Sequence, residues 1–365
     1  PRKQLMKSLE RTGGRIILLA AVGALWACDI PTDAPKLDQE WILPIAGTSI
    51  DVVEFLPEDV GVTSDTSAFT IRVDPIAFQE NLGVLCAACQ GLNGLTVPKP
   101  AFSGTFHDSL SLPDKVESAQ VQEGRVVVRA RNRFSFDPLK PPGGGTGSFT
   151  LALRDGGPAG PVLDEIVVDG IDTSFGPGVS LSRDLEYSGA VSSSLSVTVS
   201  VNSPAGGPEP GNWVLIRLTD EIEVTATPED LEVASAAVAL AGEVFNLGVT
   251  SLNVVDISKD AVDRVSAGSF RFEIVNPWSV GAVLNLTVKG PTMDDPVILI
   301  APIPPTPTST VEVEFSKAEL QSFLGEPNVV LTGQGTVNQN AGVVTLAPRQ
   351  VMTIDAKLDL VIRIG

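Results

Sequence analysis

The sequence has very few of the residues on which common catalytic centres depend. Its 365 residues include one histidine, three cysteines and one tyrosine, and aromatic residues make up only 5% of the chain. A Ser-His-Asp or Cys-His arrangement would have to use His107, and no G-x-S-x-G turn occurs anywhere in the sequence. The residues around His107, GTFHDSLSL, are typical of a strand and a turn, which favours an ordinary histidine over a catalytic one. We therefore predict that the protein is not an enzyme.

Ligands for metals and cofactors are scarce as well. A structural zinc site needs about four ligands, whereas the chain beyond Cys28 offers two thiols and one imidazole. No D-x-[DN]-x-[DN]-G calcium loop is present, and the best alternatives for calcium, Asp169-Gly170-Ile171-Asp172 and Asp294-Asp295, are weak. We expect neither a metal nor a cofactor.

Positive charge is also in short supply. The chain has 25 basic and 44 acidic residues, and its net charge is −19. Five of the basic residues and one of the acids lie in the first 27 residues, so the remaining chain carries 20 basic and 43 acidic residues, a net charge of −23. Such a body repels nucleic acid and anionic lipid headgroups. We expect no nucleic-acid partner.

One long apolar run lies near the N-terminus, at residues 16–27 (IILLAAVGALWA), and basic residues precede it. As a helix this run would span about 18 Å, well short of a hydrocarbon core of about 30 Å. A basic start, a short apolar run and small residues at its end are typical of a secretory signal. We predict that residues 1–28 are a signal segment.

The end of this run, Leu25-Trp26-Ala27-Cys28, resembles the lipobox of bacterial lipoproteins. Leu25 and Ala27 match the family pattern, whereas Trp26 stands where the family usually has a small residue. The resemblance implies that Cys28 becomes the N-terminus and carries a diacylglycerol, which anchors the protein in a bacterial cell envelope. The alternative is an ordinary signal peptide with an incidental cysteine. The polar residues 29–40 are predicted to form a tether.

The other two cysteines lie close together, in Cys86-Ala87-Ala88-Cys89. An even set of thiols in an oxidising compartment favours a disulfide. The Trp-Cys-Gly-Pro-Cys pattern of thioredoxin-like sites is missing, and Gln90 stands where haem attachment requires histidine. We favour a small-loop disulfide between Cys86 and Cys89, with free thiols and a redox or metal role as alternatives.

Two pairs of segments in the chain resemble each other. Thr48–Val60 (TSIDVVEFLPEDV) is similar to Thr250–Val262 (TSLNVVDISKDAV), and Glu123–Ser135 is similar to Ala267–Ser279. The second pair aligns Gly124 with Gly268 and Asn132 with Asn276 at one constant offset. So long a period indicates a duplicated domain rather than a solenoid, although β-rich sequences also match by chance. We predict two related domains at residues 41–245 and 246–365, the first with a CxxC-containing insertion.

The local pattern is that of strands connected by turns. Leu195, Val197, Val199 and Val201 alternate with serine and threonine, as expected for a half-buried strand. Glycine- and proline-rich clusters such as residues 141–147 and 203–212 mark the turns. One capping box, Ser316-Lys317-Ala318-Glu319, predicts a short helix that ends at about Leu324. The fold class predicted is all-β, with tandem antiparallel β-sandwiches.

The strand ending Val275-Asn276-Pro277-Trp278 resembles the strand ends of late-embryogenesis-abundant and WHy-type β-sandwiches. The resemblance implies a sandwich of Ig-like character, and it implies no catalytic residue.

Four arginines share one face of a predicted strand: Arg125, Arg129, Arg131 and Arg133. Alternate residues of a strand lie about 6.8 Å apart, so this arginine row could contact a polyanion. We favour the alternative that the arginines form cross-strand ion pairs with acids such as Asp220, Glu221 and Glu223, because a strongly acidic body repels polyanions.

These features favour a lipid-anchored envelope protein that binds another envelope protein or has a structural role. A first alternative is a carrier of a hydrophobic ligand, which needs an apolar cavity of about 300–1,000 Å³ between its sheets. A second is a carbohydrate-binding or carbohydrate-active protein, which would use exposed rings among Trp41, Trp213, Trp278 and Tyr187.

Overall fold

The structure is a computed structural model that describes residues 37–229 and 231–364. The protein is mainly β, with 56% strand and 9% helix, and its strands form several antiparallel sheets, which confirms the predicted antiparallel β architecture. The predicted signal segment, Cys28 and residues 29–36 of the predicted tether lie outside the described residues. Within the described ranges, no helix is long and apolar enough to cross a membrane.

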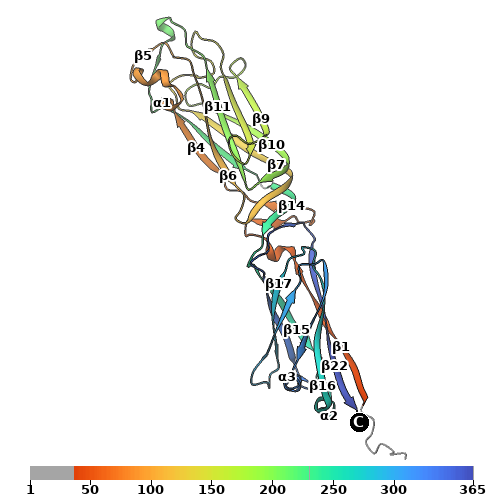
Figure 1. Ribbon diagram of the computed structural model, residues 1–365. Coiled ribbons are helices and arrows are strands. Elements are labelled where there is room, and N and C mark those ends of the chain that lie inside the picture. The colour runs from red at the N-terminus through yellow and green to blue at the C-terminus, as the bar shows by residue number, and fades with distance from the viewer. Residues whose placement is uncertain (1–36, 230, 365) are drawn as a thin grey trace, which may run out of the picture.

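The described chain forms an elongated rod in which two units built from antiparallel sheets follow each other end to end (Figure 1). We call them the proximal sandwich, which contains the first and last strands of the chain, and the distal sandwich. The first residues of β1 and the last residues of β22 pair with each other at one end of the rod. The distal sandwich occupies the other end.

The proximal sandwich consists of two four-stranded sheets. The strands of one sheet are, in order, β1 (Leu37–Asp51), β22 (Val351–Ile364), β16 (Val265–Val275) and β19 (Thr308–Phe315). Those of the other are β15 (Val244–Leu252), β20 (Val329–Val337), β17 (Ala282–Lys289) and β18 (Val297–Ile303). Two short helices, α2 (Lys259–Arg264) and α3 (Lys317–Phe323), lie at the end of this sandwich that carries the termini.

The distal sandwich also has two sheets, but one of them belongs to an eight-stranded sheet that continues into the junction. The strands of one of its sheets are, in order, β4 (Ile76–Asn81), β13 (Glu221–Pro228), β7 (Val116–Asn132) and β10 (Ser180–Ser192). Those of the other are β6 (Phe102–Ser111), β11 (Ser194–Ser203), β8 (Ser148–Asp155) and β9 (Val162–Asp169). At the far end lie α1 (Leu82–Leu85), β5 (Thr96–Val97) and β12 (Val214–Leu215), with the 3-10 turns η2 (Ala87–Leu92) and η3 (Pro210–Asn212).

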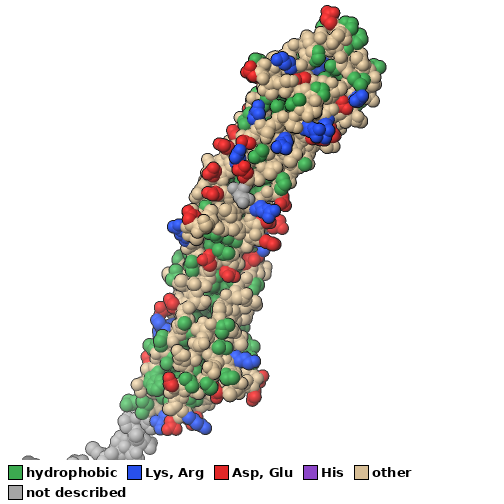
Figure 2. Space-filling model, turned by 180° about the vertical axis from the view of Figure 1, so that it is seen from behind, with side chains coloured by type: hydrophobic (Ala, Val, Ile, Leu, Met, Phe, Trp, Pro, Cys, Tyr) green, Lys and Arg blue, Asp and Glu red, His purple; other side chains and the backbone are tan. Residues whose placement is uncertain are grey.

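A junction of short strands joins the two sandwiches: β2 (Val60–Val62), β3 (Phe69–Ile71), β14 (Leu231–Ala239) and β21 (Val343–Leu346). The first half of the long strand β7 pairs with β14, and its second half pairs with β13. Because β14 also pairs with β21, a ladder of backbone hydrogen bonds connects the distal sheet to a segment of the proximal half. Figure 2 shows that Asp and Glu side chains gather around this middle part of the rod.

The packing at the junction is apolar and aromatic. Phe55, in the 3-10 turn η1 (Val52–Phe55) that follows β1, packs edge-on against Phe245 and Trp278, with ring centroids 5.5 and 4.9 Å apart. All three rings are buried. The indole Nε1 of Trp278 donates a hydrogen bond to Gln350 (2.9 Å). These residues cover the end of the proximal sandwich that faces the distal one.

The two sandwiches have the same strand order. The distal strands β4-β13-β7-β10 correspond to the proximal strands β1-β22-β16-β19. In the second sheets, the distal strands β6-β11-β8-β9 correspond to the proximal strands β15-β20-β17-β18. Corresponding strands also follow the same order along the chain. The similar segments around Asn132 and Asn276 lie at the ends of the corresponding strands β7 and β16. In each, the buried amide Nδ2 donates to the carbonyl four residues later, at 2.8 Å to Phe136 and 2.9 Å to Val280. This correspondence is what a duplicated domain requires.

The chain path between the sandwiches differs from the predicted boundaries. Residues 41–51 were predicted to lie in the first domain and residues 29–40 in a tether, but β1 begins at Leu37 and pairs with β22. Trp41 lies opposite Leu360 and Leu43 opposite Leu358, so the apolar faces of the two strands match. The distal sandwich is therefore inserted into the proximal one, between β1 and β15. Sequence periodicity shows that residues form a strand, but it does not show which distant strand lies beside them.

The similarity between residues 48–60 and 250–262 does not relate the two sandwiches to each other. Both segments begin in strands of the proximal sandwich, β1 and β15, and both strands are the edges of their sheets. Thr48 and Thr250 each follow directly after a break in strand register. Such bulges hinder unwanted pairing at a sheet edge. This similarity thus relates two edge strands within one sandwich.

The predicted helix at residues 316–324 is confirmed. α3 spans Lys317–Phe323, the Ser316 hydroxyl accepts from the Glu319 amide (3.3 Å), and the Glu319 carboxylate accepts from the Ser316 amide (2.7 Å). Leu320 and Phe323 are buried, and the Phe323 ring lies 5.3 Å from that of Phe315 on β19. The capping box fixes the start of the helix, and its apolar face holds it against the sheet.

Candidate functional site

The free end of the distal sandwich is formed by loops far apart in the sequence. We call this end the distal tip; in Figure 1 it is the part of the rod around α1 and β5. Its four loops connect strands that all end at this side of the sandwich: residues 82–101, 133–147, 170–179 and 204–220. Binding residues often lie on loops that a rigid scaffold positions, so we consider the tip first.

The first loop contains the predicted disulfide. Cys86 and Cys89 are bonded to each other, and both are fully buried. Just before them, the Asn81 side chain caps α1 by accepting from the amide of Val84 (3.1 Å). A buried disulfide is out of reach of a substrate thiol, so this arrangement serves to hold the loop rather than to perform redox chemistry.

A buried lysine ties the first loop to the fourth. The Lys99 side chain is 1% exposed, and its ammonium donates to the carbonyls of Pro100 (2.8 Å) and Pro204. It also lies 4.8 Å from the ring centroid of Phe102 and 5.6 Å from that of Phe136. Burial lowers the pKa of Lys99 to about 8. Lys99 was not among the predicted site residues, and its setting between two prolines in an apolar stretch (VPKPAF) is the signal that the sequence offers.

A buried carboxylate holds the second and third loops together. Asp137 accepts from the amides of Leu139 (2.8 Å) and Lys140 (3.0 Å), and it also accepts from the hydroxyl of Ser174 (2.7 Å) and the amide of Phe175 (2.8 Å). Each contact replaces a hydrogen bond to water that burial removes. The tip loops are therefore fixed to one another by internal polar contacts.

The tip presents apolar side chains to solvent. Four of them are Val84 (65% exposed), Leu95 (50%), Ile171 (65%) and Trp213 (41%). The indole Nε1 of Trp213 donates to the carbonyl of Pro208 (3.0 Å), which fixes the ring.

The charges of the tip balance. Its basic residues are Lys99, Arg133, Lys140 and Arg217, and its acidic residues are Asp137, Asp172, Glu209 and Asp220. The tip is thus neutral, whereas residues 28–365 as a whole carry a net charge of −23. A neutral surface with exposed aromatic and aliphatic side chains resembles the core of a protein–protein interface.

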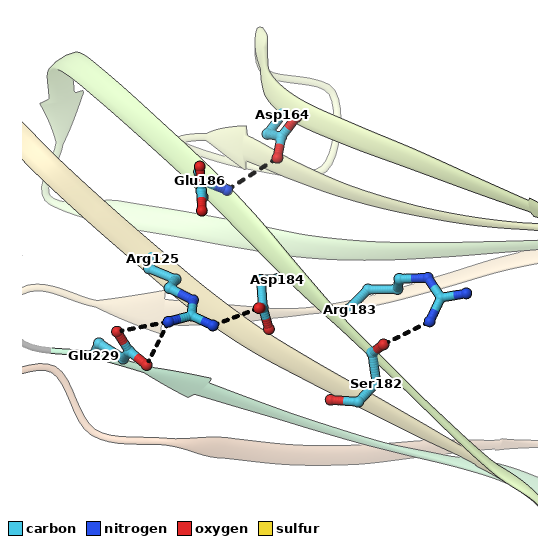
Figure 3. Close-up of polar contacts among 7 residues, drawn as sticks. All are labelled: Arg125, Asp164, Ser182, Arg183, Asp184, Glu186 and Glu229. Carbon is cyan, nitrogen blue, oxygen red and sulfur yellow. Dashed lines mark hydrogen bonds and ion pairs between the residues drawn. The ribbon is translucent and has the colours of Figure 1, made fainter.

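The arginine row lies on and just beyond β7, as the strand pattern predicted. Figure 3 shows Arg125 between Asp184 of β10 and Glu229, which follows β13, and its guanidinium lies 3.3 Å from Glu229. Arg133 pairs with Glu223 (3.0 Å). Asp184 raises the pKa of Arg125 above its usual value. These ion pairs are of the cross-strand kind that the sequence analysis favoured.

Among the described residues, Asp220, Arg129 and Arg131 do not form the ion pairs that were predicted for them. Asp220 accepts from the amide of Ser135 (3.2 Å), and its partial burial raises the pKa of that carboxyl. Within the described ranges, Arg129 and Arg131 have no carboxylate within 4.0 Å. Asp184 and Glu229 could not be foreseen from spacing, because β10 and the end of β13 meet β7 only in the folded chain.

A hollow beside Arg125 has the wrong charge for a polyanion. Its volume is about 520 Å³, and four glutamates line it: Glu123, Glu186, Glu229 and Glu232. Their charges oppose those of an anionic ligand. In the parts of the chain that the structure describes, no group of three or more His, Cys, Asp or Glu side chains is placed to hold a metal ion.

The single histidine is an exposed side chain on β6. His107 lies opposite Thr198 of the neighbouring strand β11, on the outward face of its sheet. Of the calcium candidates, Asp169 accepts from the amide of Ile171 (2.9 Å) in a local turn. Both residues have ordinary structural surroundings.

The space between the sheets of the proximal sandwich is well filled. The cavity bounded by both of its sheets, next to Thr48 and Thr250, has a volume of about 20 Å³. A ligand carrier needs a cavity of about 300–1,000 Å³. Among the four rings considered as sugar platforms, Trp278 and Tyr187 are buried, while Trp41 (36% exposed) and Trp213 (41%) lie at opposite ends of the rod.

Comparisons with known proteins give no family for this chain. Neither a protein-family model nor a curated protein matches it. A solved structure of a protein from Parabacteroides distasonis, described as secreted, aligns with 88% of this chain and 99% of its own at 10% identity, with a TM-score of 0.31. A structure of infectious bursal disease virus, Gx strain, aligns with 90% of this chain and 73% of its own at 10% identity, with a TM-score of 0.21. Similarity at this level carries no argument about function.

Proposed function

We propose that this chain is a non-catalytic protein of the bacterial cell envelope, anchored through a lipid on Cys28, that binds another envelope protein at its distal tip. The observation that carries the proposal is the position of β1. This strand begins at Leu37, at the end of the rod opposite the tip. An anchor nine residues earlier in the chain therefore holds the far end of the rod, and the tip points away from the membrane.

The length of the rod supports this role. β1 has 15 residues and β7 has 17. At about 3.3 Å per residue, two sandwiches of this size placed end to end reach about 100 Å. A buried disulfide fits an oxidising compartment, as does a secretory signal. We further propose that both units are Ig-like sandwiches that arose by duplication.

The two sandwiches also support the tip as a binding surface. The last three of the four tip loops correspond to the proximal loops after β16, β18 and β20, and the junction packs around residues of this end such as Trp278. In the proximal sandwich part of this end is thus covered by neighbouring protein, while loop residues such as Pro305 and Gln339 are exposed. In the distal sandwich the same end is free, and we propose that a partner protein covers it.

The experiment is site-specific photo-crosslinking in cells. A photoreactive amino acid is placed at Leu95 in the tip and, as a matched exposed control, at Thr310 on β19. We expect a specific adduct from the Leu95 position that is absent from the Thr310 position. Trp213→Asp should reduce the adduct at least about tenfold, because a buried unpaired charge costs several kcal/mol at an interface. Equal adducts at the two positions, or none at Leu95, would contradict the proposal.

The anchor is tested separately. Cys28→Ala should abolish acyl labelling and release the protein from the membrane fraction, whereas Cys86→Ala/Cys89→Ala should change neither. A Cys28→Ala protein that remains membrane-bound with unchanged labelling would rule out the lipid anchor.

One observation favours a second candidate, a glycan partner at the same tip. Trp213 is a fixed, partly exposed indole, and such rings stack on sugars. If the partner is a glycan, Trp213→Ala should abolish binding to purified envelope polysaccharide and Leu95→Asp should leave it nearly unchanged. If the partner is a protein, Trp213→Ala should weaken the crosslink from the Leu95 position, and the purified polysaccharide should not bind.

A further inference from the structure

The two sheets of the proximal sandwich differ in the charge of their outward faces. The sheet β1-β22-β16-β19 is covered with charged side chains that pair across its strands. Its ion pairs are Arg271–Asp359 (2.7 Å), Lys357–Glu273 (2.5 Å) and Arg363–Asp38 (3.1 Å). This face also carries further acids such as Glu312 and Glu314.

The outward face of the other sheet has almost no charge. Among the described residues of β15, β20, β17 and β18, Lys289 is the single charged one. Ile298 and Ile300 are 66% and 64% exposed on this face, and Asn246 accepts a hydrogen bond from Gln334 (3.3 Å). We call this surface the uncharged face. Its other outward residues are Val244, Val249, Ser251, Val283, Asn285, Thr287, Pro302, Val330, Thr332 and Thr336.

Both edges of this sheet are protected against pairing with another strand. β15 carries the register break between Leu247 and Thr250, with Val249 73% exposed. β18 contains Pro302, which has no amide to donate. Any association of this sheet therefore uses its face rather than its edges.

We propose that two copies of the protein associate through their uncharged faces. The net charge of −19 makes copies repel each other wherever acidic surfaces meet. The uncharged face avoids that repulsion, and a symmetric contact between two identical neutral faces needs no opposite charge. Apart from Lys289, this face offers no charge to a polyanion or a polycation. Ile298 and Ile300 lie opposite Thr287 and Asn285 of β17 and supply the apolar centre of the contact.

The face is large enough for a dimer of moderate stability. Four strands at about 4.8 Å spacing and nine residues at about 3.3 Å each cover about 600 Å². Two such faces would bury about 1,200 Å² in total, which is the lower bound of specific protein–protein interfaces.

The experiment measures the oligomeric state of the full chain in detergent micelles by sedimentation velocity, at about 1–100 µM. We expect a dimer in the wild type. Ile298→Glu/Ile300→Glu should raise the dissociation constant at least about tenfold, because it places carboxylates in a neutral contact. The matched control, Val275→Glu/Thr310→Glu, adds the same two charges to exposed positions of the opposite face and should remain a dimer.

Three results would overturn the proposal. They are a monomeric wild type over the whole concentration range, a dimer that the uncharged-face variant leaves intact, and a dimer that both variants weaken equally. A monomer whose uncharged face crosslinks to a different protein would also overturn it, because the occupant would then not be a second copy. Circular dichroism and thermal unfolding of each variant exclude loss of folding as the cause.

Discussion

The two sandwiches use one strand order but differ in what lies at corresponding ends. The proximal loop at residues 276–281 is short and lies at the junction, where Trp278 packs against Phe55. Its distal counterpart, residues 133–147, is long, rich in glycine and proline, and packs against the other tip loops rather than against a second sandwich. The sheets alone therefore do not define the function of either unit. The comparison teaches that the same scaffold supports a neighbouring domain in the proximal sandwich and presents its loops to solvent in the distal sandwich.

A substitution at the junction can disrupt the packing at the covered end of the proximal sandwich. Phe55→Ala removes a ring that contacts Phe245 and Trp278, and deletion of a buried phenylalanine costs about 3–5 kcal/mol. We expect the free energy of unfolding of the proximal sandwich to fall by that amount, measured by urea denaturation. Leu95→Ala, at an exposed position of the free tip, is the control and should cost less than about 1 kcal/mol. Equal losses in the two variants would show that the junction is not packed as described.

The free end can be tested through its buried lysine. The pKa of Lys99 is about 8 in the folded protein and near 10.5 when unfolded. Between these values the unfolded chain binds the extra proton, so folding stability should rise as the pH increases from about 8 to about 10.5. The gain is about 3 kcal/mol. Below pH 8 the penalty of the buried charge is fully present.

The measurement for Lys99 is the urea midpoint of the distal sandwich across this pH range. Lys99→Met keeps a side chain of similar length without the charge, and it should remove this rise. If the stability of Lys99→Met rises with pH as much as that of the wild type, groups other than Lys99 cause the rise.

The smallest expected effect compares the corresponding asparagines. Asn132 donates to Phe136 and Phe175 and accepts from the amide of Phe134, whereas Asn276 donates to Val280. A buried hydrogen bond contributes about 1 kcal/mol. Asn132→Ala should therefore destabilise its sandwich by about 1–2 kcal/mol more than Asn276→Ala does, measured by thermal unfolding. The opposite order would contradict the view that the distal copy uses its asparagine to hold the additional tip loop.

Much of the local structure could be predicted because it depends on neighbouring residues. The alternation at Leu195–Val201 gave a strand because a period of two places one apolar face toward a core. Ser316 and Glu319 gave the helix start because a capping box is complete within four residues. The spacing of Cys86 and Cys89 favoured a disulfide, which the structure contains.

The candidate site was less accessible to sequence reasoning. The arginine row is visible as a pattern, but its partners Asp184 and Glu229 come from other strands. Lys99 and Asp137 look like surface residues in a sequence, because polar side chains are usually exposed. Both are buried, since loops from distant segments close over them and supply their hydrogen bonds.

The amino-acid sequence by itself determined that this chain is an acidic β-protein, that Ser316 caps the start of a short helix, and that its segments repeat. Only the tertiary structure decided that β1 belongs with β22, that one sandwich is inserted into the other, and that charged and uncharged residues separate onto opposite faces. The physical reason is the range of the interactions. Side-chain alternation, capping and turns act between residues close in the chain. Strand partners, loop neighbours and surface patches depend on contacts between residues tens to hundreds of positions apart.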